Sequence, residues 1–182
     1  MMRKKWCLPF LLAVLVMIFA CGCSGGQTDS ETSGINLSSF ESTDFEGNQI
    51  NGKVFEKADL TVLNIWATYC NICIEEMPVW EELAQEYEGK GVQIIGLPAD
   101  ANSEEAVAAA KEIAKKTGVS YPQMMPSDSL INLYLNQVTA VPETVFVDGK
   151  GQVIKSIAGA QGKEEWKAMI DELCEQERGD DQ

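Results

Sequence analysis

The spacing of apolar positions changes near residue 66, and this change organises the rest of the chain. Residues 60–65 form a nearly unbroken apolar run rich in β-forming residues, which is typical of a strand buried on both faces. Farther along, apolar residues recur with the spacing of an amphipathic helix. They are Met77, Trp80, Ala84 and Tyr87. Residues 92–97 are a second apolar run, so a strand, a helix and a strand follow one another and predict two parallel strands.

The ends and the course of this first helix can also be predicted. Pro78 lies inside it and is expected to bend the helix rather than end it, because the apolar spacing continues beyond the proline. Residues 89–91, with the sequence Gly-Lys-Gly, are expected to end the helix.

Three helices are predicted farther along the chain. Ser103 is a candidate N-cap of the first, which Gly118 ends. Residues 130–135 predict a short helical segment, and residues 163–177 predict the last helix. Cys174 falls on the apolar face of this last helix, where a cysteine usually serves as a small buried hydrophobic residue. The alternative for Cys174 is a third redox thiol.

Two β-hairpins are predicted, one before and one after the first strand, helix and strand. Turn residues at 46–48 predict an N-terminal β-hairpin that ends near Val54. The turn residues 148–151 lie between residues 144–147 and residues 152–158, which predicts the second hairpin. Together these elements predict an α/β fold with a mixed sheet.

The beginning of the chain has the pattern of an export signal. Basic residues 3–5 precede an apolar stretch over residues 8–20 that is too short to span a bilayer. The following cysteines resemble a bacterial lipobox, in which a small residue precedes a cysteine that is lipidated. Cys21 fits this pattern better than Cys23, because the apolar Ile18 lies three positions upstream of Cys21. An ordinary secretory signal is the alternative.

These patterns divide the chain into four parts. Residues 1–20 are predicted to be a lipoprotein signal peptide, and residues 21–34 a flexible tether rich in Gly, Ser and Thr. Residues 35–177 are predicted to form one domain, and residues 178–182 an acidic tail. The expected location is extracytoplasmic, with a lipid anchor in the bacterial cell membrane.

Charge and cysteine content exclude several kinds of partner and site. The net charge of −14 argues against binding to nucleic acid. A Cys-X-X-Cys motif is often half of a zinc site, but the chain has no histidine and no second cysteine pair outside the leader. The Cys70 and Cys73 pair is therefore not expected to hold a metal, and no cofactor is expected.

Cys70 and Cys73 lie where the first strand passes into the helix, and this position suits thiol chemistry. The free N–H groups and the positive dipole end of a helix stabilise an anion, so Cys70 is expected to ionise below the ordinary thiol pKa of about 8.5. Cys73 lies about one turn farther on, within reach of Cys70. Two thiols so placed can form a disulfide, open it and exchange it with a partner.

The sequence around this pair resembles the thioredoxin fold, and more closely the membrane-tethered thiol-disulfide oxidoreductases of the TlpA/ResA type. The resemblance covers residues 35–177 and rests on residues 66–73, on Glu76 and Pro78, and on residues 141–144. It implies a thioredoxin-like α/β fold with an N-terminal β-hairpin and an inserted βα element. The central mixed sheet of this fold is flanked by helices.

The same resemblance implies the role of several residues. Cys70 is the attacking thiol, and Cys73 resolves the mixed disulfide. Val141 and Pro142, with the proline in the cis form, face the pair and bind an extended segment of the substrate.

Two polar positions near the cysteines call for separate interpretation. Asn64 occupies the place where ordinary thioredoxin has a buried aspartate, and an asparagine cannot take up a proton. In the TlpA/ResA type a glutamate at the position of Glu76 lies near the thiols, so Glu76 is a candidate catalytic residue. The alternative for Glu76 is a solvated helix glutamate like its neighbour Glu75.

The expected function is a protein-disulfide reductase that passes electrons from the Cys70 and Cys73 dithiol to an exported client protein with a disulfide. The expected protein is a monomer and receives its electrons from a membrane thiol donor of the CcdA/DsbD type. No cation lies between the cysteines to stabilise the thiolate and so the reduced form, which favours a reductant. Apocytochrome c and an exported methionine sulfoxide reductase are both candidate clients, and the sequence does not choose between them.

Three alternatives remain beside this function. A disulfide-donating oxidant would use the same residues in the opposite direction. A peroxiredoxin-like peroxidase needs a Pro-X-X-X-Thr-X-X-Cys loop, whereas Thr68 lies two rather than three residues before Cys70 and the matching proline is missing. A redox-inert binding module would usually have lost one of the two cysteines, and both are present.

Overall fold

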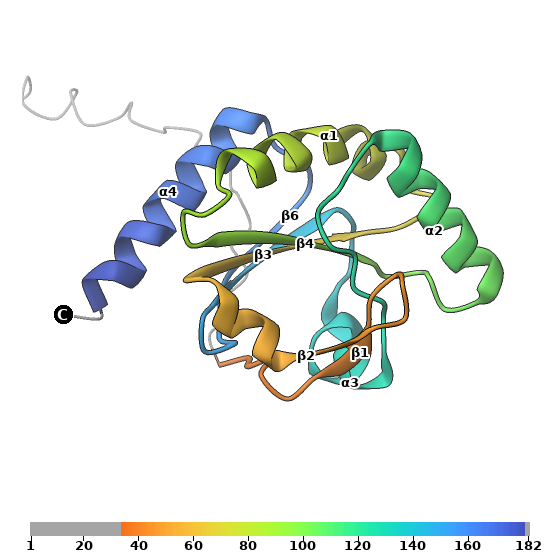
Figure 1. Ribbon diagram of the computed structural model, residues 1–182, viewed down its shortest axis with the longest axis horizontal. Coiled ribbons are helices and arrows are strands. Elements are labelled where there is room, and N and C mark those ends of the chain that lie inside the picture. Colours follow the sequence, from red (N-terminus) through yellow and green to blue (C-terminus); the bar gives the residue numbers. More distant parts are fainter. Residues whose placement is uncertain (1–33, 181–182) are drawn as a thin grey trace, which may run out of the picture.

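The computed structural model describes residues 34–180, which form a central sheet covered on both faces (Figure 1). The sheet has four strands in the order β4-β3-β5-β6. Strand β3 pairs in parallel with β4 and antiparallel with β5, and β5 pairs antiparallel with β6. The bounds are Leu60–Trp66 for β3, Val92–Pro98 for β4, Glu143–Asp148 for β5 and Val153–Ala158 for β6. The predicted mixed sheet and parallel first pair are thus confirmed.

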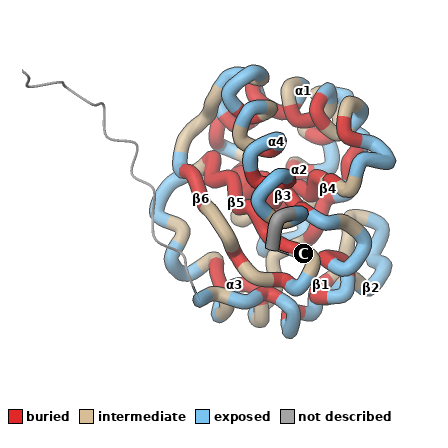
Figure 2. Tube along the Cα trace, turned by 90° about the vertical axis from the view of Figure 1, so that its left-hand side faces the viewer, coloured by how far each residue is buried: buried red, intermediate tan, exposed pale blue. Residues whose placement is uncertain are grey.

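Strand β3 lies in the middle of the sheet, and every one of its residues is buried. Figure 2 shows this arrangement, with β3 and β5 in the buried interior and many exposed residues on the outer sides of the helices. A strand covered on both faces needs apolar residues at consecutive positions, which explains the unbroken apolar run of its sequence. Its carboxyl end therefore delivers the next residues to one fixed edge of the sheet.

Three helices cover one face of the sheet (Figure 1). They are α1 (Asn71–Glu86), α2 (Glu104–Thr117) and α4 (Lys163–Asp180). Trp80 of α1 and Trp166 of α4 pack against each other with ring centroids 4.9 Å apart. Both side chains are fully buried, and burying large aromatic side chains contributes strongly to the stability of a core. The position of α4 is therefore fixed against α1.

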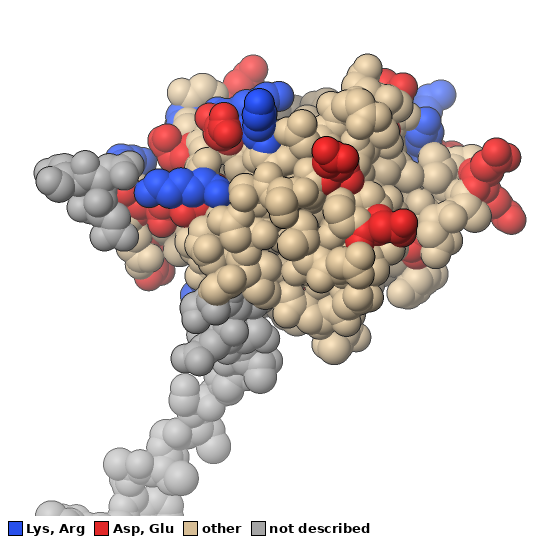
Figure 3. Space-filling model, turned by 90° about the horizontal axis from the view of Figure 1, so that it is seen from below, with Lys and Arg blue, Asp and Glu red and all other residues tan. Residues whose placement is uncertain are grey.

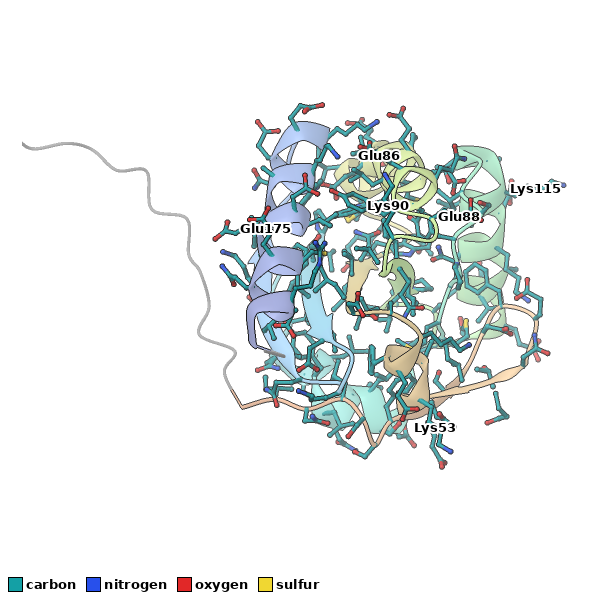
Figure 4. The ribbon with its side chains drawn as sticks, turned by 60° about the vertical axis from the view of Figure 1, so that its left-hand side comes forward. Lys53, Glu86, Glu88, Lys90, Lys115 and Glu175 are labelled. Atoms are coloured by element: carbon teal, nitrogen blue, oxygen red, sulfur yellow. A yellow bond between two sulfur atoms is a disulfide. The ribbon has the colours of Figure 1, made fainter. Side chains whose placement is uncertain are left out.

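Ion pairs add to this contact between α1 and α4. The Nζ atom of Lys167 lies 2.5 Å from Oε1 of Glu86, and Nζ of Lys163 lies 2.8 Å from Oε2 of Glu82. Glu86 projects from the end of α1 on the side of α4, as Figure 4 shows. These side chains are partly exposed to solvent, which screens the charges, so each pair adds little to stability. The apolar contact between the helices remains the larger contribution.

The opposite face of the sheet carries short elements (Figure 1). They are strands β1 (Glu41–Thr43) and β2 (Gln49–Asn51), the 3-10 helices η1 (Gly52–Lys57) and η2 (Leu135–Gln137), and helix α3 (Asp128–Leu133). Strands β1 and β2 form the predicted N-terminal β-hairpin. Its second strand ends at Asn51, so Val54, near which the hairpin was expected to end, belongs to η1 instead. The first residue of η1 is Gly52, and only glycine fits there, because a Cβ atom would lie 1.9 Å from the carbonyl oxygen of Ser38.

The segment between α2 and β5 contains the predicted inserted βα element. Its β part is a single parallel bridge between Gly96 of β4 and Gln123 rather than a full strand, and its helix is α3. The side chain of Gln123 also accepts a 3.1 Å hydrogen bond from Nε1 of Trp66. The insertion is thus joined to the last residue of β3, beside the cysteine pair.

The helix ends agree with most of the sequence predictions. Helix α1 runs through Pro78 and ends at Glu86, before the predicted Gly-Lys-Gly end. The Oγ atom of Ser103 accepts a hydrogen bond from the backbone of Ala106, as expected of an N-cap, and Gly118 ends α2 in the left-handed conformation. Helix α4 continues to Asp180 and so includes the first residues of the predicted acidic tail.

The predictions for the beginning of the chain lie outside the described residues. These are the signal peptide, the lipidation candidates Cys21 and Cys23, and the tether up to residue 33. Within residues 34–180, no helix combines the length and the apolar character needed to cross a membrane.

Candidate active site

Cys70 and Cys73 form a disulfide at the start of α1, with their Cα atoms 5.3 Å apart. Cys70 is the N-cap of the helix, and its sulfur accepts a 3.3 Å hydrogen bond from the backbone N–H of Cys73. The N–H groups of a helix N-terminus favour a thiolate at this place once the disulfide is reduced. Cys70 is 9% exposed and Cys73 is fully buried, so an incoming sulfur can reach Cys70 only.

The turn that carries Cys70 is held by Asp100, which follows β4. The backbone N–H of Thr68 donates 3.0 Å hydrogen bonds to both carboxylate oxygens of Asp100, and the Thr68 hydroxyl donates a 2.5 Å bond to Oδ2. Hydrogen bonds to a carboxylate are stronger than those between neutral groups. Asp100 therefore fixes the turn between β3 and the disulfide.

Sequence reasoning missed Asp100, although a signal for it existed. Asp100 comes two residues after the end of β4, the buried strand that was expected to pair in parallel with β3. The carboxyl ends of neighbouring parallel strands lie at the same edge of a sheet, so a polar residue after β4 is expected near the residues after β3.

Val141 and Pro142 lie opposite the exposed side of the disulfide. The peptide bond between them is cis, as the resemblance implied, and the carbonyl oxygen of Val141 lies 3.6 Å from Sγ of Cys70. In the reduced protein, the Cys70 thiol could donate to this oxygen. Tyr69 and Ile72 are 76% and 51% exposed on either side of Cys70 along the chain. Apolar surface therefore surrounds the sulfur that a partner would attack.

Glu76 is buried, being 4% exposed, and is not the solvated glutamate that was its alternative. Its Oε1 atom accepts a 2.9 Å hydrogen bond from the backbone of Gln161 and a 2.8 Å bond from Nε1 of Trp166. Burial raises the pKa of the Glu76 carboxyl group, and these two donors oppose the rise. Glu76 thus holds a proton more readily than a surface glutamate, one helical turn from Cys73.

Asn64 lies in the middle of β3 and is fully buried. It pairs with Gly96 of β4 and with Thr144 of β5 in the sheet. Its amide does not titrate, so Asn64 cannot exchange a proton with the cysteines. Among the buried residues of α1, Glu76 alone has a carboxyl group, and it lies about one helical turn beyond Cys73.

Sequence reasoning also missed a buried pair behind the Val141 and Pro142 loop. The hydroxyl of Tyr134 donates a 2.5 Å hydrogen bond to Oε1 of Glu143, the residue after Pro142. Both side chains are buried, and burial raises the pKa of the Glu143 carboxyl group. No pattern in the sequence could have indicated this contact, because it joins a segment of the insertion to a strand.

Cys174, the third cysteine of the part of the chain that the structure describes, is buried as predicted. Cys174 is free and buried, and burial raises the pKa of its thiol. A protonated and enclosed thiol is a poor nucleophile. Within residues 34–180, no three side chains of His, Cys, Asp or Glu are grouped as metal ligands.

Only the Cys70 sulfur of this disulfide can be reached from the surface, which suits thiol-disulfide exchange. The fold and the site together define the class of the thiol-disulfide oxidoreductases. The chain belongs to the Redoxin family, whose sequence model matches residues 33–171, and within it to the thiol-disulfide oxidoreductases of the ResA type. It is 32% identical over 172 residues to thiol-disulfide oxidoreductase ResA of Bacillus thuringiensis subsp. konkukian, and the match covers 90% of this chain and 95% of that protein. The TlpA/ResA resemblance of the sequence is thereby confirmed.

Two further proteins extend the comparison. Thiol:disulfide interchange protein DsbE of Haemophilus influenzae is 31% identical over 138 residues, which cover 73% of this chain and 71% of that protein. A thiol:disulfide interchange protein of the thioredoxin family from Chlorobium tepidum has a similar structure, with a TM-score of 0.64 over 75% of this chain and 94% of that one. Its sequence is 21% identical, so this second likeness supports the thioredoxin-like fold alone.

Proposed function

We propose that this protein is a membrane-anchored, extracytoplasmic disulfide reductase that passes electrons from the Cys70 and Cys73 dithiol to an exported client protein. The observation that carries the proposal is the unequal burial of the two sulfurs. Cys70 is the residue that can contact the partner, and Cys73 is buried in the first turn of α1. The similarity to ResA proteins supports the class of reaction.

The proposed reaction has two exchange steps. First, the Cys70 thiolate attacks one sulfur of the client disulfide, so that a mixed disulfide forms and the other client sulfur leaves as a thiolate. Second, Cys73 loses its proton and attacks Sγ of Cys70, which releases the first client sulfur. Two electrons have then passed to the client, which holds two thiols, and the protein holds the disulfide described above. A dithiol donor must reduce the protein before the next cycle.

The groups around the sulfurs support the reducing direction. A strong oxidant of this kind needs its thiolate to be stabilised, because that stabilises the reduced form. The residues between the cysteines are Asn71 and Ile72, which carry no charge. The nearest buried ionisable group along α1 is Glu76, whose negative charge would oppose a thiolate. The disulfide is therefore favoured over the dithiol, as a reductant requires.

Glu76 is proposed to take part in the second step. Burial makes the pKa of a thiol higher, so Cys73 needs a proton acceptor when it attacks. The carboxyl group of Glu76 has a raised pKa, and Glu76 and Cys73 are both buried residues of α1. A base with a pKa closer to neutrality accepts a proton more effectively than an ordinary surface carboxylate.

The proposed client, electron donor and location rest on the sequence and on the family, and not on the geometry of the site. Lipidation at Cys21 would place the domain outside the cytoplasm, on a tether that ends near residue 34. Apocytochrome c and an exported methionine sulfoxide reductase both present disulfides that must be reduced. A membrane thiol donor of the CcdA/DsbD type would restore the dithiol, with the protein acting as a monomer.

Trapping of the mixed disulfide tests this function. The reduced full-length Cys73→Ser variant, in detergent, is mixed with oxidised apocytochrome c or with an oxidised methionine sulfoxide reductase. The variant should accumulate a mixed disulfide with a client, because the second step is blocked. Cys70→Ser should trap none, and Cys174→Ser should turn over the client like the unmodified protein, since Cys174 is buried away from the surface. Failure of the unmodified reduced protein to reduce either client would contradict the proposal for these clients, and trapping through Cys73 would contradict the order of attack.

A further inference from the structure

A pocket of about 360 Å³ lies beside the disulfide, on the side of the inserted element. Tyr69 lines it from the turn before Cys70, and Val141 lines it from the loop that faces Cys70. Ile131 of α3 and Leu135 of η2 also line it. A client segment attached to Cys70 would therefore pass directly over its mouth.

The residues that line the pocket differ in polarity and charge. Most of its lining is apolar or neutral, with Ala67, Leu135 and Val138 among the apolar residues. Asp100 is the one acidic residue of the lining, and no Lys or Arg belongs to it. The space thus combines apolar walls with a single negative charge.

Thr68 holds the carboxylate of Asp100 in place, but the carboxylate can still accept a further hydrogen bond. Its Oδ2 atom takes two hydrogen bonds from Thr68, and its Oδ1 atom takes one. A carboxylate oxygen has two acceptor positions, so at least one remains on Oδ1. Because the Thr68 bonds hold the carboxylate in place, a ligand would find it already oriented.

We infer that this pocket binds a lysine or arginine side chain of the client, carried within about three residues of the cysteine that Cys70 attacks. The inference rests on the proposed reductase function. The aliphatic stem of such a side chain can pack on the apolar wall while its charged end meets Asp100. An acidic side chain would be repelled, and an apolar one would remove water from Asp100 without replacing it.

The distance along the client follows from the geometry. The carbonyl oxygen of Val141 lies 3.6 Å from Sγ of Cys70, and Val141 is also part of the pocket. An extended chain advances about 3.3 Å per residue, so the near wall of the pocket, at Val141, lies about one residue from the client cysteine, and we test up to three residues on either side of it.

The surroundings of the pocket agree with a basic ligand. The face of the molecule that carries α3 is largely uncharged, with separate acidic side chains, and its Lys and Arg side chains lie toward the edges (Figure 3). With a net charge of −14, the whole chain also attracts rather than repels a basic segment.

A set of disulfide-bonded peptides tests the inference with the reduced full-length protein in detergent. Each peptide carries one intramolecular disulfide and places Lys, Leu or Glu at one of three positions on either side of it. At one position, kcat/KM for reduction should be about tenfold higher with Lys than with Glu, and higher with Lys than with Leu. The ratio of the Lys to the Leu peptide is the readout, so each variant serves as its own reference.

Two substitutions should remove this preference and a third should keep it. Asp100→Asn removes the charge, and Thr139→Lys places a competing cation in the pocket from an exposed position. Both should bring the Lys to Leu ratio close to one. Gln137→Lys adds the same charge two residues away, outside the pocket lining, and should leave the ratio above one.

The possible failures are distinguishable. Equal reduction of all peptides, a preference for Leu, or a Lys preference that survives both pocket substitutions would overturn the inference and leave the reductase function standing. Failure to reduce any peptide would overturn the reductase function and the inference with it.

Discussion

The hydroxyl of Tyr134 donates a 2.5 Å hydrogen bond to Oε1 of Glu143, and this bond ties the end of α3 to the first residue of β5. Between them, residues 135, 136 and 138–141 line one wall of the pocket, and the loop that faces Cys70 ends this segment. The inserted element therefore has a direct mechanical connection to the active site. Its packing and the position of the Val141 carbonyl group depend on each other.

The Tyr134→Phe substitution should destabilise the protein by about 1–3 kcal/mol, because it leaves a buried carboxyl group without one of its donors. Urea unfolding of the oxidised protein measures this change. Tyr69→Phe is the matched control: Tyr69 is 76% exposed, so its free energy of unfolding should change by less than about 0.5 kcal/mol. Equal stability of the Tyr134→Phe variant and the unmodified protein would show that the bond contributes nothing.

The raised pKa of Glu143 predicts how stability depends on pH. The folded protein holds the Glu143 proton more tightly than the unfolded chain, whose carboxyl group titrates near 4.5. This contribution is fully present below pH 4.5 and is lost as the pH rises through the folded pKa. Glu143→Gln should therefore weaken the fall of the unfolding free energy above pH 4.5. Glu75→Gln, at an exposed position, should leave the whole curve unchanged; an identical pH slope in the Glu143 variant would refute the assignment.

Substitution of Glu76 should have two opposite effects. Without the negative charge, Glu76→Gln should let Cys70 ionise at lower pH and so react faster with a small alkylating agent at neutral pH. Without the proton acceptor, release of a trapped client disulfide should slow by at least about tenfold. Stopped-flow alkylation across pH and single-turnover reduction of a client measure the two effects.

The exposed Glu75 provides the control for this experiment, since Glu75→Gln removes the same charge from the next residue of the same helix. That variant should match the unmodified protein in both measurements. If Glu76→Gln also matches it, the buried carboxyl group has a structural role alone.

Lipid anchoring can be tested through the two candidate lipidation sites, Cys21 and Cys23. The protein should partition into detergent and incorporate a fatty-acid probe through Cys21. Cys21→Ser should abolish the label and release the protein, while Cys23→Ser should keep both properties. If the label depends on Cys23 instead, the lipid is attached two residues farther along the chain. If the label depends on neither cysteine, the lipobox prediction is wrong.

The sequence predicted the elements of this fold well because its signals are local. The apolar run of β3 and the helical spacing after Cys73 each follow from burial of a single element. The same holds for Ser103 and Gly118, whose cap positions are set by the hydrogen bonds of one helix end. The error at Val54 has the same origin, since an apolar residue in a buried 3-10 turn looks like the end of a strand.

The site was only partly predictable, because several of its contacts join distant segments. The cysteine pair and the following helix are neighbours in sequence, so the easier ionisation of Cys70 could be predicted from local pattern, whereas its role as the attacking thiol came from the resemblance. The bond between Glu76 and Trp166 spans 90 residues, and the bond between Thr68 and Asp100 spans 32. The first contact depends on how α4 packs against α1, which no local pattern encodes, and the second depends on the parallel pairing of β3 and β4, which brings the ends of both strands to one edge of the sheet.

The reduction potential of the Cys70 and Cys73 pair tests the central claim most directly. The reduced and oxidised forms are equilibrated with glutathione buffers of known potential, and the fraction of disulfide is measured by thiol labelling. With no cation between the sulfurs and a buried Glu76 on the same helix, the potential should lie closer to that of thioredoxin, about −270 mV, than to the oxidant end of the range near −120 mV. A value close to −270 mV is the result expected of a reductase, and a value near −120 mV would contradict it and make the protein a donor of disulfides.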